Sequence, residues 1–277
     1  MAITGTGTQA DPFKPTTWEE FLSCTTSDGV YTELPEGGGT FDMNDYYPEG
    51  ITEIIPLRGF INGNGWTIKS AYYRGSRYAF EMSTSDSYGK ITALNFINFR
   101  FEGMATGAAL IGTPSGTYVG QAFTLCQFSG RVERVQGGYC AVTLGGYNSM
   151  HFRCSYNIEF KGQVSIDTGQ FCATSKYCNI TISALDNNSP FYLMPDNSYV
   201  SGSASPLMLI TVGGGQTIYS VLDVETQYIG FETGSATMAL VNTDKYSGSL
   251  PSGCIGVTTA QLKDAEYLSS LGFPIQT

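Results

Sequence analysis

The sequence predicts an all-β fold in which short strands stack as successive coils of a parallel β-helix, a form of solenoid. The first observation is the composition, because 277 residues include 34 Gly, 18 Tyr and 16 Phe and only 14% are charged. Such a composition is typical of β structure with many turns. The second observation is that short apolar or alternating runs recur between residues 51 and 255, each ending at Gly, Asn, Ser or Pro. Alternation of this kind indicates strands.

The third observation is that these runs resemble one another. Residues 98–103 (Asn-Phe-Arg-Phe-Glu-Gly) align with residues 157–162 (Asn-Ile-Glu-Phe-Lys-Gly), and Cys126, Cys154 and Cys178 occupy equivalent places in successive runs. Repeats of irregular length fit the coils of a parallel β-helix, in which each turn stacks on the previous one and extra residues loop outward. We therefore expect one β-helix over residues 51–255.

Residues 1–50 predict a turn-rich N-terminal segment that caps the first coil. Residues 17–22 have the pattern of a short helix, in which Thr17 is the N-cap and Glu20 completes a capping box. Trp18, Phe21 and Leu22 then lie on one face of the helix and cover apolar surface. Because an exposed strand edge recruits other chains, we expect this helix to close the N-terminal end of the solenoid.

Residues 256–277 predict a second helix followed by a tail. Thr259 begins the helix and Gly272 ends it. Its apolar face consists of Leu262, Ala265 and Leu268. We expect this helix to be the last closure of the domain.

The charge of the chain argues against several classes of partner. Acidic residues number 24 against 14 basic ones, which gives a formal net charge of −10. Nucleic acids and anionic membranes are recognised by clustered Lys and Arg, and the sequence has no such cluster. No apolar run reaches the length of a membrane-spanning helix. We therefore expect no nucleic-acid binding and no membrane insertion.

The cysteines are expected to be reduced and to act as small hydrophobic residues of the core. Their odd number excludes complete pairing, and no two have the spacing of a common zinc module. Since residues 1–8 carry neither a basic start nor an apolar run, we expect no secretory signal and assembly in a bacterial-type cytoplasm. No metal and no cofactor is expected. The seven cysteines are Cys24, Cys126, Cys140, Cys154, Cys172, Cys178 and Cys254.

No catalytic residue is assigned from the sequence. The only histidine, His151, lies in an expected strand and is interpreted as structural. A pair of carboxylates about 5–10 Å apart can hydrolyse a glycan, and on a β-helix the two can come from different coils. The alternative is that the acids form a solvated outer face. The carboxylates in or near expected strands are Asp167, Asp186, Asp223 and Glu225, of which the last two share a strand face.

The candidate contact residues for a glycan or a protein partner are tyrosines in the first third of the chain. Tyrosine is common at interfaces and stacks on sugar rings, because its body is apolar and its tip is polar. The alternative is that these side chains pack against neighbouring loops or a sister subunit. The candidates are Tyr46, Tyr47, Tyr72, Tyr73 and Tyr78.

Three segments resemble known β-helix proteins. Residues 5–13 (Gly-Thr-Gly-Thr-Gln-Ala-Asp-Pro-Phe), with the Thr-Trp-Glu-Glu-Phe helix, resemble a module of bacterial surface β-helix proteins and phage fibre-like proteins. Residues 61–68 (Ile-Asn-Gly-Asn-Gly-Trp-Thr-Ile) are similar to the first coil of pectate-lyase-like β-helices, and residues 259–273 to a C-terminal helix of the surface proteins. The resemblance implies a single-stranded, right-handed parallel β-helix of the tailspike, virion-fibre or adhesin type. The regular glycine-rich repeats of adhesins are missing.

The resemblance implies a bacteriophage virion structural protein: a fibre, spike or capsid decoration subunit that acts in display or in adhesion to host-surface glycans without catalysis. This step is an analogy between folds. The expected partners are two further copies in a homotrimer, other virion proteins and a host-surface glycan. One alternative is a tailspike-type glycan depolymerase, either a hydrolase or a lyase. Another is an adhesin on the bacterial cell surface whose leader has been removed.

Overall fold

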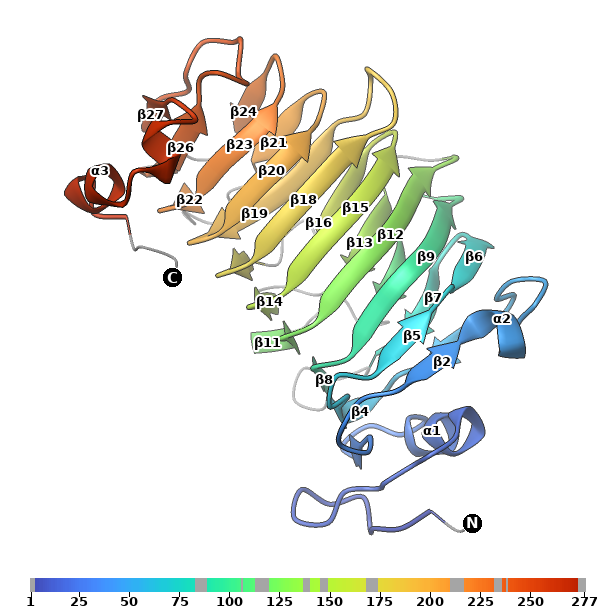
Figure 1. Cartoon of the computed structure of the whole chain (residues 1–277). Coiled ribbons are helices and arrows are strands. Elements are labelled where there is room, and N and C mark those ends of the chain that lie inside the picture. Colours follow the sequence, from blue (N-terminus) through green and yellow to red (C-terminus); the bar gives the residue numbers. More distant parts are fainter. Residues whose placement is uncertain are drawn as a thin grey trace.

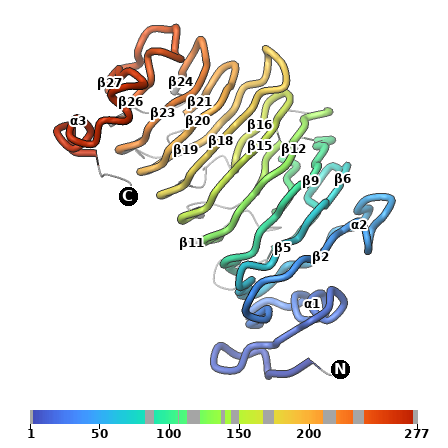
Figure 2. Tube along the Cα trace, viewed as in Figure 1, coloured from blue at the N-terminus to red at the C-terminus, as the bar shows by residue number. Residues whose placement is uncertain are grey.

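The computed structural model is a mostly β protein built from long parallel sheets, with short helices near its two ends (Figure 1). The strands lie side by side in sequence order from the N-terminal to the C-terminal end of the molecule (Figure 2). This confirms the predicted all-β class and the parallel strands. The structure describes residues 3–82, 89–105, 107–112, 120–136, 140–144, 149–167, 174–209, 217–231, 236–237 and 239–273.

One sheet, which we call the long sheet, has 11 strands within the described residues, all paired in parallel. Neighbouring strands of this sheet follow one another in sequence order, so each strand pairs with the matching strand of the previous repeat. The exception is β6, which pairs with β9 beside β5. The strands are β2 (Thr40–Asp42), β5 (Thr67–Lys69), β6 (Tyr72–Gly75), β9 (Asn95–Gly103), β12 (Gln127–Arg134), β15 (Ser155–Lys161), β18 (Asn179–Ala184), β20 (Tyr199–Ser203), β23 (Val221–Glu225), β26 (Ala239–Asn242) and β27 (Cys254–Val257).

The other large sheet forms two rows that meet at β19 (Phe191–Asp196). Met194 of this strand pairs with β17, whereas Phe191 pairs with β16. The first row contains β1 (Tyr31–Glu33), β4 (Gly59–Asn62), β8 (Gly89–Thr92), β11 (Gly120–Thr124), β14 (Ser149–Phe152) and β17 (Thr174–Lys176). The second row contains β3 (Ile55–Pro56), β7 (Tyr78–Glu81), β10 (Ala108–Gly112), β13 (Cys140–Leu144) and β16 (Val164–Asp167), and continues beyond β19 into β21 (Leu207–Leu209) and β24 (Ile229–Phe231). A separate parallel pair joins β22 (Thr217–Ile218) and β25 (Ala236–Thr237).

The chain repeats one path, from the first row to the long sheet and then to the second row. Strands β8, β9 and β10 make one passage, β11, β12 and β13 the next, and β14, β15 and β16 the one after. Because matching strands pair in parallel, each passage stacks on the one before it. The arrangement is consistent with a parallel solenoid.

The core lies between the sheets, and strands such as β15 fill it with alternate residues, whereas β10 is buried at every position. In β15 the residues alternate between buried and outward-facing, which is the alternation that the sequence predicts. The rings of Phe96, Phe128 and Tyr156 stack through three successive coils, with centroids 5.5 and 5.0 Å apart. Burial of one such phenylalanine stabilises the fold by roughly 1.5–3 kcal/mol relative to an exposed ring.

The strand register confirms most of the predicted repeat alignment. Gly130 of β12 pairs with Phe99 on one side and with Ile158 on the other, so Phe99 and Ile158 are equivalent. The register shifts just before this point, where Asn98 is an extra residue with a φ of 54°. Such a bulge inserts one residue without changing the alternation that follows it. Asn98 and Asn157 are therefore not equivalent, although the sequence alignment paired them.

The predicted stacking of three cysteines is also confirmed. Cys126, Cys154 and Cys178 directly precede β12, β15 and β18, and the register of these strands superposes the three positions. All three are buried free thiols. Burial raises the pKa of the thiols of Cys126 and Cys154 well above the ordinary value, so both stay protonated. Cys172 lies outside the described residues.

Helix α1 (Trp18–Cys24) begins at the predicted cap. The Thr17 hydroxyl accepts the backbone N–H of Glu20 at 3.3 Å. The Glu20 carboxylate accepts the backbone N–H of Thr16 at 2.8 Å, one residue before the position expected in a capping box. The hydrogen bonds that the carboxylate accepts from the backbone N–H and the hydroxyl of Thr16 lower the pKa of Glu20 below its ordinary value.

The packing of α1 agrees with the role of an N-terminal cap. Trp18 and Phe21 are buried in the main core, Leu22 is partly buried against it, and Cys24 is also buried. The Trp18 and Phe21 rings lie 5.3 and 5.6 Å from the ring of Phe41 in β2. The one-turn helix α2 (Met43–Tyr46) follows β2.

The predicted C-terminal helix consists of two pieces, the 3₁₀ turn η1 (Gln261–Lys263) and the helix α3 (Ala265–Ser270). They are separated at Asp264, which has an extended backbone. Its side chain caps α3 by accepting the N–H of Tyr267 at 3.0 Å. Gly272 ends the helix with a φ of 79°, as predicted. The competing cap at Asp264 explains why one continuous helix does not form.

The C-terminal helix covers a sheet face, whereas the sequence suggested that it closes the domain. Leu240, Val257 and Phe273 form a buried cluster separate from the main core, and Leu262 and Leu268 pack against it. Leu240 lies between Ala239 and Val241 of β26, whose side chains belong to the main core. The side chain of Leu240 therefore points outward, and the helix lies on the outer face of the last strands of the long sheet.

Candidate ligand-binding groove

The corner between the first row and the long sheet is built from one residue per coil in the left-handed backbone region. We call these six residues the corner column. Their φ angles lie between 48° and 55°. Each precedes a side chain that enters the core, as Tyr177 precedes Cys178. In chain order the corner column is Ala93, Leu125, Arg153, Tyr177, Asn197 and Tyr219.

Backbone hydrogen bonds continue between coils through this corner. The N–H of Leu125 donates to the carbonyl of Phe152, and that of Tyr177 donates to Asp196, each at 3.0 Å. The column residues therefore keep the same coil-to-coil register as the strands of the sheets on both sides. Their side chains project outward: Leu125 is 54% exposed and Tyr177 is 46% exposed.

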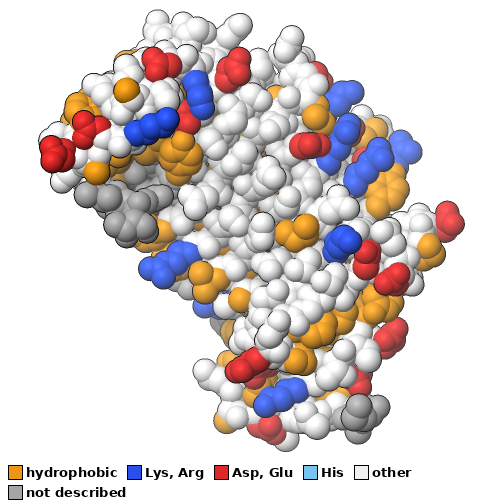
Figure 3. Space-filling view, viewed as in Figure 1, with side chains coloured by type: hydrophobic (Ala, Val, Ile, Leu, Met, Phe, Trp, Pro, Cys, Tyr) orange, Lys and Arg blue, Asp and Glu red, His pale blue; other side chains and the backbone are white. Residues whose placement is uncertain are grey.

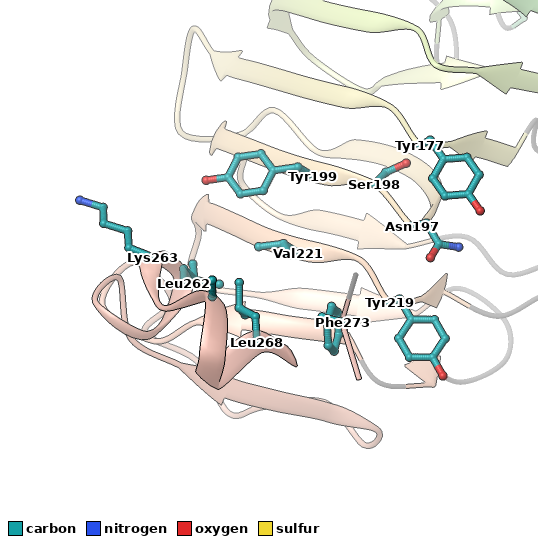
Figure 4. Close-up of a pocket in the computed structure, with 11 residues that line it drawn as sticks. Tyr177, Asn197, Ser198, Tyr199, Tyr219, Val221, Leu262, Lys263, Leu268 and Phe273 are labelled. Atoms are coloured by element: carbon teal, nitrogen blue, oxygen red, sulfur yellow. The ribbon is translucent and has the colours of Figure 1, made fainter. Parts of the chain in front are cut away.

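A cavity of about 440 Å³ lies between the C-terminal end of the corner column, the outer face of the long sheet and the C-terminal helix. We call it the corner groove. Figure 4 shows Tyr177, Asn197 and Tyr219 on one side, Val221 on the strand behind, and Leu262 and Leu268 on the helical side. Lys263 extends away from the cavity. The lining residues are Tyr177, Asn197, Ser198, Tyr199, Tyr219, Val221, Leu262, Lys263, Ala265, Leu268 and Phe273.

The position of the Tyr199 ring is fixed by a polar network. Its hydroxyl donates to Asp223 at 2.6 Å, and Asn242 Nδ2 donates to the same carboxylate at 2.6 Å. Lys245 Nζ lies 3.0 Å from Asp223 Oδ1. Burial opposes ionisation of Asp223, but these three hydrogen bonds outweigh it and lower the pKa of the carboxyl. Burial and the bond to Asp223 raise the pKa of Tyr199 well above its ordinary value.

The other wall of the corner groove is apolar. The Tyr219 ring contacts the Phe273 ring edge to face, with centroids 5.5 Å apart. Away from this wall, the visible outer face of the long sheet is mostly uncharged and polar, with hydrophobic side chains gathered beside the C-terminal segment (Figure 3). The groove therefore combines fixed aromatic rings with a few amide and hydroxyl groups, a combination suited to binding a flat, partly polar ligand.

The structure separates the five tyrosines that the sequence proposes as contact residues. Tyr46 and Tyr72 are each 36% exposed, and Tyr72 lies under the guanidinium of Arg100, 5.2 Å from the ring centroid. Tyr47 is partly buried against the main core. Tyr73 and Tyr78 are buried, so their rings present little surface to a ligand. None of the five lines the corner groove.

Two of the four candidate carboxylates line a second groove, about 620 Å³ in volume, at the opposite edge of the long sheet. Asp186, Glu225 and Lys245 are among its lining residues. Asp186 accepts the hydroxyl of Ser189 and the backbone N–H of Asn188, the latter at 3.1 Å, and these bonds lower the pKa of Asp186. Asp223 belongs to the Tyr199 network. The side chain of Asp167 lies outside the described residues.

His151 occupies the interior, as the structural interpretation expects. It is fully buried, and its ring contacts the hydroxyls of Thr143 and Tyr156. Burial lowers the pKa of His151 to about 3, so the ring is neutral at physiological pH.

Sequence reasoning missed the corner groove, although one signal was present. Cys126, Cys154 and Cys178 mark equivalent positions, so the residues before them had to form an equivalent column. What the sequence did not show is the left-handed backbone at Leu125, Arg153 and Tyr177, because Gly and Asn are the residues that usually indicate it.

Comparison with known proteins finds no matching family, curated protein or solved structure. Within the described residues, no helix has the length and apolar character needed to cross a bilayer.

Proposed function

We propose that the protein is a bacteriophage virion structural protein, a fibre, spike or decoration subunit, that binds a host-surface glycan in the corner groove without catalysis. We propose further that its fold is a single-stranded right-handed parallel β-helix. The observation that carries the binding function is the placement of Tyr177 and Tyr219 two coils apart, with Asn197 between them, at the edge of the cavity.

Stacked strands set the spacing of these side chains. Adjacent coils are about 4.8 Å apart, so the backbones at Tyr177 and Tyr219 are separated by roughly 10 Å. That separation is close to the length of two linked sugar rings. Aromatic faces stack on the apolar faces of sugars, and the amide of Asn197 offers hydrogen bonds to hydroxyl groups between them.

The state of the nearby ionisable groups favours binding over turnover. Asp223 is held ionised by Tyr199, Asn242 and Lys245, and an ionised carboxylate cannot act as the proton donor of glycoside hydrolysis. A rigid stack of parallel strands suits display of a surface to a partner. By this proposal the protein is a homotrimer attached to other virion proteins, and light scattering of the purified protein tests the trimer directly.

The binding function is tested with a panel of purified bacterial capsular polysaccharides and lipopolysaccharide O-chains. The wild-type protein should bind at least one of these polysaccharides when they are printed on a microarray. Y177A and Y219A should each weaken that binding about tenfold, because each removes one aromatic face; loss of an aromatic partner costs roughly 1–3 kcal/mol where the stacked ring is a nucleobase. Y228A is the matched control, since Tyr228 is 57% exposed and lies outside the groove. If Y177A, Y219A and Y228A all bind with the affinity of the wild-type protein, the proposal is contradicted.

A second candidate function is glycan cleavage in the groove lined by Asp186 and Glu225. The observation in its favour is that carboxylates from β23 and from the segment after β18 line one cavity. Incubation of the bound polysaccharide with the wild-type protein tests it. Release of reducing ends or unsaturated products that D186N and E225Q both abolish would establish cleavage and overturn binding without catalysis.

A further inference from the structure

The corner column continues beyond the groove towards the N-terminal end of the molecule. Arg153 lies one coil before Tyr177, and its guanidinium carbon is 5.3 Å from the centroid of the Phe152 ring. The Phe152 ring meets the Tyr177 ring edge to face, with centroids 5.7 Å apart. A series of ring contacts therefore links Tyr177, which lines the groove, to Arg153. Leu125, the preceding column residue, is also exposed.

The charge of this surface differs from that of the whole chain. The protein carries a formal charge of −10, yet two cations, Arg153 and Lys176, flank the Phe152–Tyr177 pair. Lys176 Nζ pairs with Asp196 at 3.4 Å. Arg153 is exposed and, within the part of the chain that the structure describes, forms no ion pair. Its guanidinium is available to an anionic group of a ligand.

The backbone at these positions is unfavourable for the residues that occupy it. Leu125, Arg153 and Tyr177 have φ angles of 55°, 51° and 54°, and in this left-handed region Cβ of such a residue comes too close to the following carbonyl oxygen. Gly or Asn would build the same corner at lower cost. Strain of this kind is concentrated at functional sites, where the side chain is needed for another purpose.

We propose that the corner column binds a linear acidic polysaccharide that lies along the stacking direction of the coils. The rings of Tyr219 and Tyr177 stack on its sugar rings, and the guanidinium of Arg153 donates two hydrogen bonds to a carboxylate of the polymer in a bidentate pair. The column spans six coils, roughly 24 Å, which accommodates several sugar units. This inference rests on the proposed glycan-binding function, to which it adds the class and the direction of the ligand.

The test compares a uronic-acid capsular polysaccharide with the same polymer after chemical reduction of its carboxyl groups. Binding of the full chain is measured by biolayer interferometry at low and at high salt. The wild-type protein should bind the acidic polymer about tenfold more tightly, because a hydrogen bond to a charged group contributes roughly 1.5–3 kcal/mol. High salt should reduce that preference. R153Q should bind both polymers with the affinity that the wild type has for the reduced one.

The matched control is R77Q, which removes the same charge from an exposed arginine outside the corner column. It should keep the full preference for the acidic polymer. Equal binding of the two polymers by the wild-type protein, or an R153Q variant that keeps the preference, overturns the inference. In both cases the proposed function still stands if Y177A and Y219A weaken binding of the reduced polymer. Loss of the preference in R77Q as well assigns the effect to net charge and also overturns the inference.

Discussion

Single residues in left-handed backbone conformations define the outer corner of this protein. Leu125, Arg153 and Tyr177 stand where Gly or Asn would be less strained, and each presents its side chain to solvent or to a neighbouring ring. The cysteine repeat predicted that these positions are equivalent. It could not predict their backbone conformation, which is imposed by stacking against the coils on both sides.

Relief of this strain should stabilise the protein. L125N replaces an exposed leucine at a φ of 55° with a residue that tolerates this region. We expect the free energy of unfolding to rise by about 1 kcal/mol, measured by urea denaturation. L250N is the control, because Leu250 is also exposed but is not among the residues with positive φ. An L125N variant no more stable than the wild type would contradict the assignment of strain.

His151 should make stability depend on pH. Its pKa is about 3 in the folded protein, against an ordinary value of 6.5, so the unfolded chain binds a proton in the interval between them that the folded protein does not. Stability is therefore complete above about pH 6.5 and falls as the pH decreases towards 3, by up to about 1.4 kcal/mol per unit. H151Q should flatten this slope relative to the wild type in urea denaturation between pH 4 and 7. Identical slopes for H151Q and the wild type would show that His151 does not control the pH dependence of stability.

Among the elements, the two terminal helices have different roles, although the sequence suggested one role for both. The apolar pattern of residues 17–22 correctly predicted a helix on the main core. The pattern of residues 259–272 predicted a helix, but not the break at Asp264 or the surface that the helix covers. Amphipathicity shows that a helix has a buried face; the partner of that face depends on tertiary packing.

The difference can be measured with one substitution in each segment. F21A removes a ring from the main core and should lower the free energy of unfolding by roughly 3–5 kcal/mol. F273A removes a ring from the separate cluster over the outer face. It should expose the amides of α3 to hydrogen exchange while leaving those of β12 and β15 protected. Loss of protection across all these strands in F273A would show that the C-terminal helix is part of the main closure.

Across the whole molecule, the sequence predicted the all-β class, the parallel stacking and the inward columns, because these follow from local alternation and repetition. The tyrosines proposed as contact residues came from local clustering alone, and the structure distributes them between the surface and the core. The corner groove depends on residues from β20, β23 and α3, which only the folded chain brings together. The proposed function follows from this assembly of distant segments.

The most direct test of the account is a crystal structure of the protein with an oligosaccharide prepared from a bound polysaccharide. The account predicts sugar rings stacked on Tyr177 and Tyr219, in a chain that follows the direction in which the coils stack. An oligosaccharide bound instead between Asp186 and Glu225, with the corner groove empty, would contradict it.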